Sequence, residues 1–370
     1  MAGRTRRAAK PAGAARQGGT AEGGRPGQAD IARMLGVSVS TVSRALADSS
    51  AINDALKARI VEAATEIGYA TKERRPVERL DSITVLCTIN SFRDTRSSVY
   101  FALLEGIKQE SASLAGQIET VMSREGDPVP DAIAETLGPR NGCIFLGIVP
   151  GLDTSAALVE RGVPVVVCNG IDEDLVVDSI SPANHSGGKI MAQQLMALGH
   201  RKFLYLSGVN RQTLQRRFVG FRDWVEDGSG VAGAAVDELN LGSDISDHHA
   251  SAFTEFMKTR GRQVTAVCCY NDGAAVWAVE YLKAMGLSVP QDVSVAGFDD
   301  MPIAQIASPP LSTFRIDWEE IGRQTARMLH ARMVEPQRAV HFLQVGGNFI
   351  SRDSTAAPDA ARTHGDTAPA

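Results

Sequence analysis

The sequence predicts a small all-α unit of three helices, joined by a linker to a larger α/β domain of two lobes with parallel sheets. Three observations lead to this prediction. Residues 29–69 contain three short segments of helical periodicity, separated by turn and cap signals. After Leu80, apolar runs of strand length alternate with longer stretches of helical period. Between these regions the chain is mostly charged and includes Pro76, which indicates a linker.

Length and composition set the number and class of the folded units. The chain has 370 residues, 44% of them hydrophobic and 22% charged, as in an ordinary globular protein. Single cores seldom exceed roughly 250–300 residues, so more than one unit is expected. Residues 1–80 carry 14 Lys and Arg against 8 Asp and Glu, whereas the remainder carries 24 against 35. A basic end suits a partner with a phosphate backbone, although a solvated basic tail explains the charge equally well.

The cysteines and the N-terminus both indicate a reducing compartment. Most cysteines lie in apolar runs, and none has the spacing of a metal site. They are Cys87, Cys143, Cys168, Cys268 and Cys269. The N-terminus lacks the apolar core of a secretion signal, and no run of about 18 apolar residues occurs. The expected location is therefore the cytoplasm.

Both ends of the chain are expected to be disordered. Residues 1–26, mainly Gly, Ala and Arg, are predicted to form a flexible basic arm. Residues 353–370 are predicted to form a tail and show no heptad pattern. The predicted units between them are the head (27–70), the hinge (71–81) and the α/β domain (82–352).

The stretch DIARMLGVSVSTVSR, residues 30–44, has the pattern of a helix-turn-helix. Gly36 lies at the expected tight turn, and Ser38 is placed to cap the second helix. The side chains expected to point outward from that helix are Val39, Ser40, Thr41, Ser43 and Arg44. Hydroxyls and an Arg suit the major groove of DNA. A third helix from Asn53 to Ile67 completes a bundle, and simple packing without DNA is the alternative interpretation.

The body contains continuous apolar runs, which indicate strands covered on both faces in parallel sheets. The runs are Ile83–Cys87, Cys143–Val149, Val163–Cys168, Phe203–Leu206, Thr265–Cys269 and Val293–Ala296. A helix is expected from His185 to Leu198, ending at Gly199.

Polar residues follow four of these runs. They are Asn90, Asn169, Asn271 with Asp272, and Asp299 with Asp300. Ligands of open parallel sheets bind outside the carboxyl ends of the strands, so the repeated pattern predicts a binding cleft. Any one of these residues taken alone is more often a turn residue or a helix cap.

The head resembles that of the lactose-repressor and galactose-repressor (LacI/GalR) family of transcription regulators. The segments DIA, MLGVS, STVSRAL and EAATEIGY follow the family pattern without a gap from Asp30 to Tyr69. By this resemblance, bases are read by Val39, Ser40 and Arg44, and phosphates are held by Ser38, Thr41 and Ser43. Two polar contacts with the DNA backbone that the family makes are missing here. The family usually has a Thr two or three residues before Asp30, where this chain has Gly27 and Gln28, and it usually has an Asn at the position of Ala47.

The hinge departs further from the family. In the family this segment forms a short helix on DNA, and a Leu from it wedges into the minor groove. Here the segment is shorter, and Pro76 breaks its middle. The expected hinge residues are Arg74, Arg75 and Leu80, of which Leu80 is the only Leu available. A weaker bend of the operator is therefore expected.

From about Ile83 to Arg352 the body resembles the family's type I periplasmic-binding-protein-like sensor domain. The sequence motifs that carry this resemblance are ALGHRKF (197–203), RRFVGF (216–221), YND (270–272), VPQDVSVAGFDD (289–300) and PPLSTFR (309–315). The resemblance implies that Arg217 and Asp272 line the effector pocket, facing each other across a cleft, where they could bind vicinal hydroxyls or a planar polar ring. Arg217 could instead serve a structural ion pair, and Tyr100 could stack on the ligand or only pack. Asn169 and Ala183 stand where many relatives have Asp, so the resemblance does not identify a particular ligand.

The same resemblance implies the wider organisation. The N-lobe is expected in residues 82–182 and 303–335, and the C-lobe in 183–302 and 338–352. Two protomers are expected to bind one palindromic operator, with repression as the usual output. The effector is expected to be a sugar or sugar phosphate, with nucleobases next, and the direction of its effect on DNA binding is open.

No catalytic, metal or cofactor site is expected. The segment Gly187-Gly188-Lys189 lacks the Ser or Thr and the first Gly of a phosphate loop. The adjacent pair His248 and His249 would not share a helix face. A rival function is a stand-alone solute-binding protein or a sugar-metabolising enzyme on a similar fold. The missing export signal argues against the first, and the missing catalytic set argues against the second.

Overall fold

A computed structural model describes most of the chain. The described residues are 27–46, 52–67, 79–88, 99–124, 132–133, 135–208, 211–242, 247–261 and 263–359. Contacts divide the chain into two units, Met1–Val77 and Glu78–Ala370. We call the described parts of these units the head and the body.

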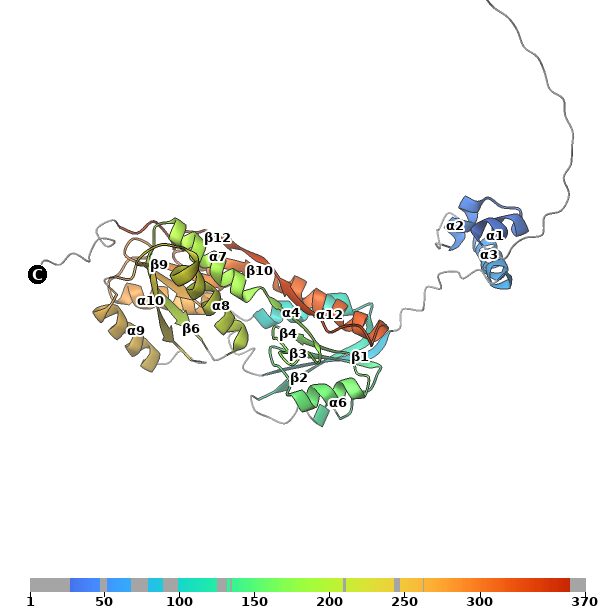
Figure 1. The fold of residues 1–370 in the computed structure, drawn as a ribbon, viewed down its shortest axis with the longest axis horizontal. Helices are drawn as coiled ribbons and strands as arrows, with labels where there is room; N and C mark the ends of the chain where they lie inside the picture. The colour runs from blue at the N-terminus through green and yellow to red at the C-terminus, as the bar shows by residue number, and fades with distance from the viewer. Residues whose placement is uncertain are drawn as a thin grey trace, which may run out of the picture. The chain divides into compact units, whose positions relative to one another are not determined.

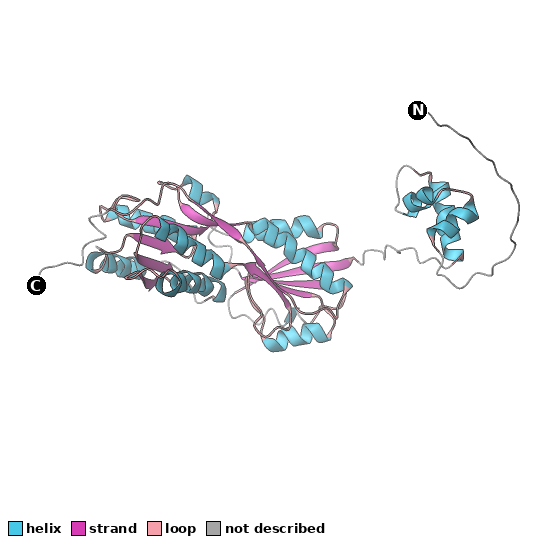
Figure 2. Ribbon diagram, turned by 45° about the horizontal axis from the view of Figure 1, so that its top comes forward, coloured by secondary structure: helices cyan, strands magenta, loops and turns pink. Residues whose placement is uncertain are grey.

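The described part of the head is helical (Figure 2). Its helices are α1 (Gln28–Leu35), α2 (Val39–Leu46) and α3 (Asp54–Glu66). Small and branched side chains form the core: Ile31, Ala32, Val42, Ala45, Ile60, Ala63 and Ala64. The predicted turn is confirmed, because Gly36 adopts a left-handed φ of 68°. The predicted cap is also confirmed, because Ser38 Oγ accepts from the Thr41 amide at 3.1 Å. At the start of the third helix, Asn53 Oδ1 accepts from the Ala55 amide at 2.8 Å.

The body contains two six-stranded sheets, each flanked by helices (Figure 2). The N-lobe sheet has the order β11-β5-β4-β3-β1-β2. Its strands are β1 (Leu80–Thr88), β2 (Ala115–Ser123), β3 (Asn141–Leu146), β4 (Val165–Cys168), β5 (Asp178–Pro182) and β11 (Phe342–Val345). All of its pairings are parallel, as the continuous apolar runs predicted.

The C-lobe sheet repeats the same plan in the order β12-β10-β9-β8-β6-β7. Its strands are β6 (Lys202–Ser207), β7 (Ala235–Asn240), β8 (Ala266–Cys269), β9 (Ser294–Asp299), β10 (Ser312–Ile316) and β12 (Gly347–Ile350). Only β12 runs antiparallel to its neighbour. Parallel strands place their carboxyl ends at one edge of each sheet, which is where ligands bind in such folds.

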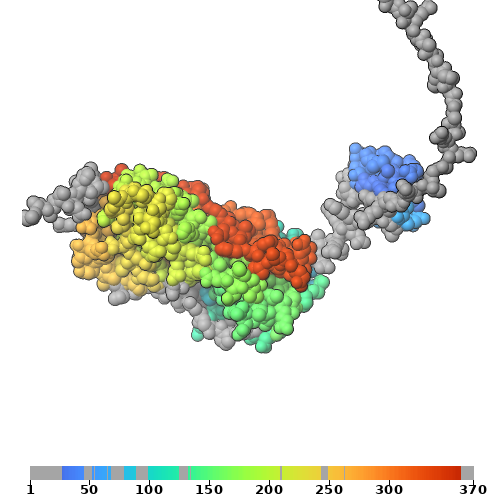
Figure 3. Space-filling model, viewed as in Figure 1, coloured from blue at the N-terminus to red at the C-terminus, as the bar shows by residue number. Residues whose placement is uncertain are grey.

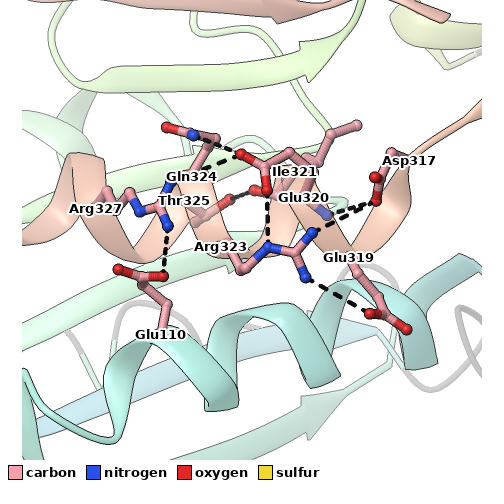
Figure 4. A network of polar contacts seen from close by, with 9 residues as sticks. All are labelled: Glu110, Asp317, Glu319, Glu320, Ile321, Arg323, Gln324, Thr325 and Arg327. Atoms are coloured by element: carbon pink, nitrogen blue, oxygen red, sulfur yellow. Dashed lines mark hydrogen bonds and ion pairs between the residues drawn. The ribbon is translucent and has the colours of Figure 1, made fainter.

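In each lobe two helices cross closely at a point where one of them carries a glycine. In the N-lobe, α4 (Val99–Ser111) packs on α12 (Trp318–Val334), and in the C-lobe, α7 (Asn184–Ala197) packs on α8 (Gln212–Asp223). A Cβ on Gly106 would lie 2.0 Å from the carbonyl oxygen of Glu319, and one on Gly188 would lie 2.0 Å from that of Arg217. Figure 4 shows that the ion pair of Arg327 with Glu110, at 2.9 Å, joins the two helices of the N-lobe pair.

The other helices cover the sheets. They are α6 (Leu152–Glu160), the π-helix η2 (Trp224–Gly228), α9 (Asp247–Thr259), α10 (Asp272–Ala284) and α11 (Pro302–Ile306). None of the described helices is both long and apolar enough to cross a membrane. All five cysteines are free and buried, as their sequence context predicted.

The chain crosses between the lobes three times: after β5, after β10 and between β11 and β12. In Figures 1 and 3 the red C-terminal part of the chain extends along both lobes. The predicted lobe boundaries need correction here. Residues 303–316 belong to the C-lobe because β10 pairs with β9, and β11 belongs to the N-lobe because it pairs with β5.

The predicted tail also begins too early. Residues 353–359 are described and pack on the C-lobe. Ser354 is fully buried, and its hydroxyl donates to the Val295 carbonyl at 2.6 Å. His200 is buried between the Thr265 hydroxyl and the Ala356 carbonyl, at 2.8 and 2.9 Å. Burial lowers the pKa of His200 to about 4.

Candidate functional site

The outer face of α2 carries a row of short polar side chains. Exposed positions are Ser38, Val39, Ser40, Ser43 and Arg44, and Thr41 is half-buried. On the opposite side, Val42 and Ala45 are buried in the head core. The sequence produces this separation because apolar residues three positions apart share one helix face. All six predicted DNA-contact residues therefore lie on one surface or at its rim.

Hydrogen bonds fix the start of this helix. Ser38 Oγ lies 2.8 Å from both Ser40 Oγ and Thr41 Oγ1, in addition to capping the Thr41 amide. Within the described residues, Arg44 makes no hydrogen bond and no ion pair. Its guanidinium is therefore available to an external acceptor such as a guanine edge or a phosphate.

The hinge prediction is wrong for Leu80. Arg74, Arg75 and Pro76 lie outside the described residues, but Leu80 is the first residue of β1 and only 1% exposed. Its amide donates to the Leu114 carbonyl at 2.9 Å. The body begins at Arg79 rather than at residue 82, so Leu80 is a core residue and cannot serve as an exposed wedge.

In the C-lobe the predicted residues Arg217 and Asp299 form a buried ion pair. Arg217 Nη1 lies 3.0 Å from Asp299 Oδ1, and the two side chains are 3% and 6% exposed. Arg217 also donates to Asn184 Oδ1 at 2.8 Å and to the Tyr270 carbonyl at 2.7 Å. Its guanidinium stacks 4.0 Å from the centre of the Phe298 ring.

Electrostatics and backbone strain mark this end of β9. Burial raises the pKa of Asp299, and the Arg217 charge opposes that rise. Asp299 and Asp300 both have positive φ, 104° and 56°, which non-glycine residues rarely adopt. Such strain is typical of binding sites, where surrounding contacts hold the backbone in place.

The predicted placement of Asp272 is wrong. It does not face Arg217 across a cleft, because both residues belong to the C-lobe. Asp272 is fully buried, and its two oxygens accept from the Thr313 hydroxyl at 2.6 Å and the Met301 amide at 2.7 Å. Burial and the neighbouring Asp299 raise its pKa well above the ordinary value. Asp272 therefore ties α10 to β10 and to the chain after β9.

A second group of contacts joins the lobes. Arg211, which caps α8 in the C-lobe, donates to Tyr100 Oη at 2.6 Å and to the carbonyls of Gly147 at 2.9 Å and Asn169 at 3.3 Å. We call Tyr100, Gly147, Asn169 and Arg211 the Arg211 cluster. It brings together two predicted residues, Tyr100 and Asn169, whereas Asn90 lies outside the described residues. Nearby on α8, Arg216 pairs with Glu173 of the N-lobe at 3.4 Å.

Arg211 was missed by sequence reasoning, although a signal was present. The rule that polar residues follow strand ends was applied to four apolar runs but not to Phe203–Leu206. Ser207, Arg211 and Gln212 follow that run directly. Chemically, the two groups offer guanidinium donors, carbonyl acceptors and a carboxylate near the carboxyl ends of both sheets. Across the described part of the chain, no group of three or more His, Cys, Asp or Glu side chains could hold a metal ion.

Two family models match the chain. Residues 29–72 match the model described as bacterial regulatory proteins of the lacI family, and residues 192–355 match the periplasmic binding protein-like domain. The chain is 30% identical over 314 residues to the HTH-type transcriptional regulator MalR of Streptomyces coelicolor, covering 81% of this chain and 88% of MalR.

Solved structures share the fold. A complex of the transcriptional regulator CelR with cellobiose has a TM-score of 0.63 and 24% identity, covering 89% of this chain and 100% of that one. The lac repressor dimer bound to operator and an anti-inducer has a TM-score of 0.61 and 21% identity, covering 89% and 98%. Together with the helix-turn-helix head and the two-lobed body, these similarities show that the chain belongs to the LacI family of bacterial transcriptional regulators.

Proposed function

We propose that this protein is a transcriptional repressor that binds a palindromic operator as a homodimer. In this proposal α2 enters the major groove, and a small sugar-like effector between the lobes controls the affinity for DNA. The observation that carries the proposal is the exposed row on α2, which ends in Arg44 and is held by the Ser38 cap. The solved lac repressor relative is bound to an operator as a dimer, which supports the same arrangement here.

Base reading is assigned to Val39, Ser40 and Arg44, and phosphate contact to Ser38, Thr41 and Ser43. Short hydroxyls at the start of a helix suit phosphate oxygens, because the helix N-terminus adds a positive partial charge. Arg44 is the only one of the six that can form two parallel hydrogen bonds with guanine. It is therefore the residue whose loss should change base preference.

The test uses a palindromic duplex selected by the full-length protein from a random library. Arg44→Ala should weaken binding about 5- to 150-fold and relax the preference at one base pair, since a good bidentate contact contributes about 1–3 kcal/mol. Fluorescence anisotropy at fixed salt measures both effects. Arg33→Ala is the matched control, because Arg33 is an exposed arginine of α1 in the same head. Equal effects of the two substitutions would show that Arg44 contributes only a general charge attraction to DNA, which would contradict the assignment.

The body presents a surface suited to a second copy of the chain. A cavity of about 770 Å³ lies between α4 and α11, bordered by Phe101, Ile303, Ile306 and Trp318 among others. Phe101 is 51% exposed and Ile306 81% exposed, which is unusual for large apolar side chains on one face. An apolar face on each protomer is what a symmetric interface buries.

The dimer is tested by sedimentation velocity. Ile306→Asp should shift the full-length protein toward the monomer and weaken operator binding, since a charge would be buried in the interface. Leu152→Asp serves as the control, because Leu152 is 53% exposed on α6, away from this surface. Loss of the dimer in both variants, or in neither, would contradict this surface.

The effector is assigned to the strand ends where Arg217, Asp299 and the Arg211 cluster lie. Hydrogen-bond donors and acceptors at such positions suit a polyhydroxylated ligand. The CelR relative binds cellobiose in its solved complex, which supports a sugar-like ligand for this chain. The direction of control that we propose is repression relieved by the effector. It is tested by measuring operator affinity with and without each sugar of a carbohydrate panel.

A further inference from the structure

The Arg211 cluster contains a positive charge with no negative partner. The guanidinium is partly buried, yet all three of its described contacts are neutral oxygens from the N-lobe. Within the described residues, no carboxylate pairs with Arg211. Moving a cation away from water without a counter-charge is unfavourable, so an anion at this position would be stabilised.

Four other arginines near the strand ends have carboxylate partners. Arg217 pairs with Asp299, and Arg216 pairs with Glu173. Asp300 pairs with Arg315 and Arg352, at 2.5 and 2.6 Å. The carboxylates of Asp172 and Asp272 are occupied by backbone amides and a hydroxyl. Among these arginines, Arg211 is the one without a carboxylate partner in the described part of the chain.

Unused hydrogen-bonding capacity lies close to Arg211 along the chain. An arginine has five N–H donors, and three contacts are described for Arg211. Ser207 Oγ and Gln212 Oε1 are buried and have no hydrogen-bond partner among the described residues. Ser207 is the last residue of β6 and Gln212 the first residue of α8, on either side of Arg211 in the sequence. Buried polar atoms without partners are rare, and they are expected where a ligand supplies the missing bonds.

We propose that the effector is an acidic sugar, a sugar phosphate or a sugar carboxylate, whose anionic group binds Arg211 and whose hydroxyls bind Ser207 and Gln212. The inference rests on the proposed function, since it names the ligand class of the interlobe site. A neutral sugar would leave the Arg211 charge uncompensated, because its hydroxyls could accept from the guanidinium but would bring no negative charge.

The experiment is isothermal titration of the full-length protein with a matched ligand series. The probes are glucose, glucose 6-phosphate, gluconate, glucuronate and inorganic phosphate. At least one acidic sugar should bind about tenfold or more tightly than glucose, as expected for a hydrogen bond to a charged group. Inorganic phosphate should bind more weakly than that sugar, because it lacks the hydroxyls. Comparing glucose 6-phosphate with gluconate and glucuronate identifies whether the site prefers a phosphate or a carboxylate.

Three variants separate recognition from structure. Arg211→Gln should remove the preference for the acidic sugar, whereas Arg211→Lys should retain part of it through the charge. Arg216→Gln is the matched control on the same helix and should keep the full preference. Circular dichroism melting verifies that each variant is folded, and Arg211→Lys keeps the test valid if Arg211→Gln does not fold.

Four results would overturn the inference: equal binding of glucose and its acidic counterparts, no binding of any acidic sugar, inorganic phosphate binding as tightly as the best sugar, or an unchanged preference in Arg211→Gln. A neutral sugar that alters operator affinity would overturn this inference while leaving the proposed function intact. Conversely, acidic-sugar binding without any operator binding would keep the inference and contradict the proposed function.

Discussion

The two lobes of the body follow one plan but place their buried charges at opposite ends of the sheet. In the N-lobe, Asp178 is the first residue of β5 and pairs with Arg332 of α12 at 2.8 Å. In the C-lobe, Asp299 is the last residue of β9 and pairs with Arg217 of α8 at 3.0 Å. Only the second pair lies at the carboxyl end, where ligands bind. The same chemistry is therefore structural in one lobe and suited to binding in the other.

Breaking either buried pair should produce the largest effect. Arg217→Met or Arg332→Met leaves a buried carboxylate without its guanidinium, which should lower the free energy of unfolding by about 3–5 kcal/mol. Urea denaturation of the full-length protein measures this loss. Arg217→Met should also change sugar binding, whereas Arg332→Met should not. Loss of binding in both variants would remove the proposed difference between the lobes.

The glycine crossings should respond alike in the two lobes. Gly106→Ala and Gly188→Ala each place a Cβ 2.0 Å from a backbone oxygen of the partner helix, so each should cost about 1–3 kcal/mol or more. Gly151→Ala is the control, because nothing lies within 4 Å of a Cβ there. Thermal melting of the three variants checks this prediction. A tolerated alanine at either crossing would show that this helix pair can separate.

His200 should make the C-lobe sensitive to acid. Its folded pKa of about 4 lies below the ordinary value of 6.5, so the unfolded chain binds more protons between these values. The stability that His200 contributes is complete above pH 6.5 and falls as the pH decreases toward 4. At pH 5 the loss should be about 2 kcal/mol. Urea denaturation at pH 7 and pH 5 should therefore show a flatter pH dependence for His200→Gln than for the wild type.

The raised carboxyl pKa values act in the opposite direction. Asp272 and Asp299 contribute stability that is complete at low pH and is lost as the pH rises through their raised values. Subtracting the His200→Gln profile from the wild-type profile cancels this contribution. Parallel profiles for the two proteins would contradict the role assigned to His200.

The exposed ion pairs of α4 and α12 should matter least. Arg327 is 48% exposed and pairs with Glu110 in the network of Figure 4. Solvent and salt weaken such pairs, so Arg327→Met should shift the urea midpoint far less than Arg332→Met does. The remaining shift should shrink further in 1 M salt. A loss comparable with that of Arg332→Met would show that exposure is a poor guide to these pairs.

The sequence predicted the head and the central strands well, because both depend on apolar pattern and local caps. The strands that it missed have other reasons to form. β2 and β7 are edge strands whose side chains are mostly exposed or half-buried, so they lack a continuous apolar run. β5 is buried but polar, since Asp178, Ser179 and Ser181 gain hydrogen-bond partners from the surrounding fold.

The site was predicted only in part, because long-range partners decide what a polar residue does. Asp299 follows an apolar run in the sequence, Arg217 belongs to a motif of the family resemblance, and the fold pairs them. Asp272 follows the same rule, yet Thr313 and Met301 occupy both of its oxygens. Arg211 binds oxygens that are 42 to 111 residues away along the chain, a relation that no local pattern contains.

The central claim is that the head and the body are linked, so that effector binding and operator binding change each other. The direct measurement is a pair of titrations with the full-length protein: the operator dissociation constant with and without saturating acidic sugar, and the sugar dissociation constant with and without operator. Both dissociation constants should change by the same factor, as linkage requires. A sugar that binds between the lobes and leaves the operator dissociation constant unchanged would contradict this claim.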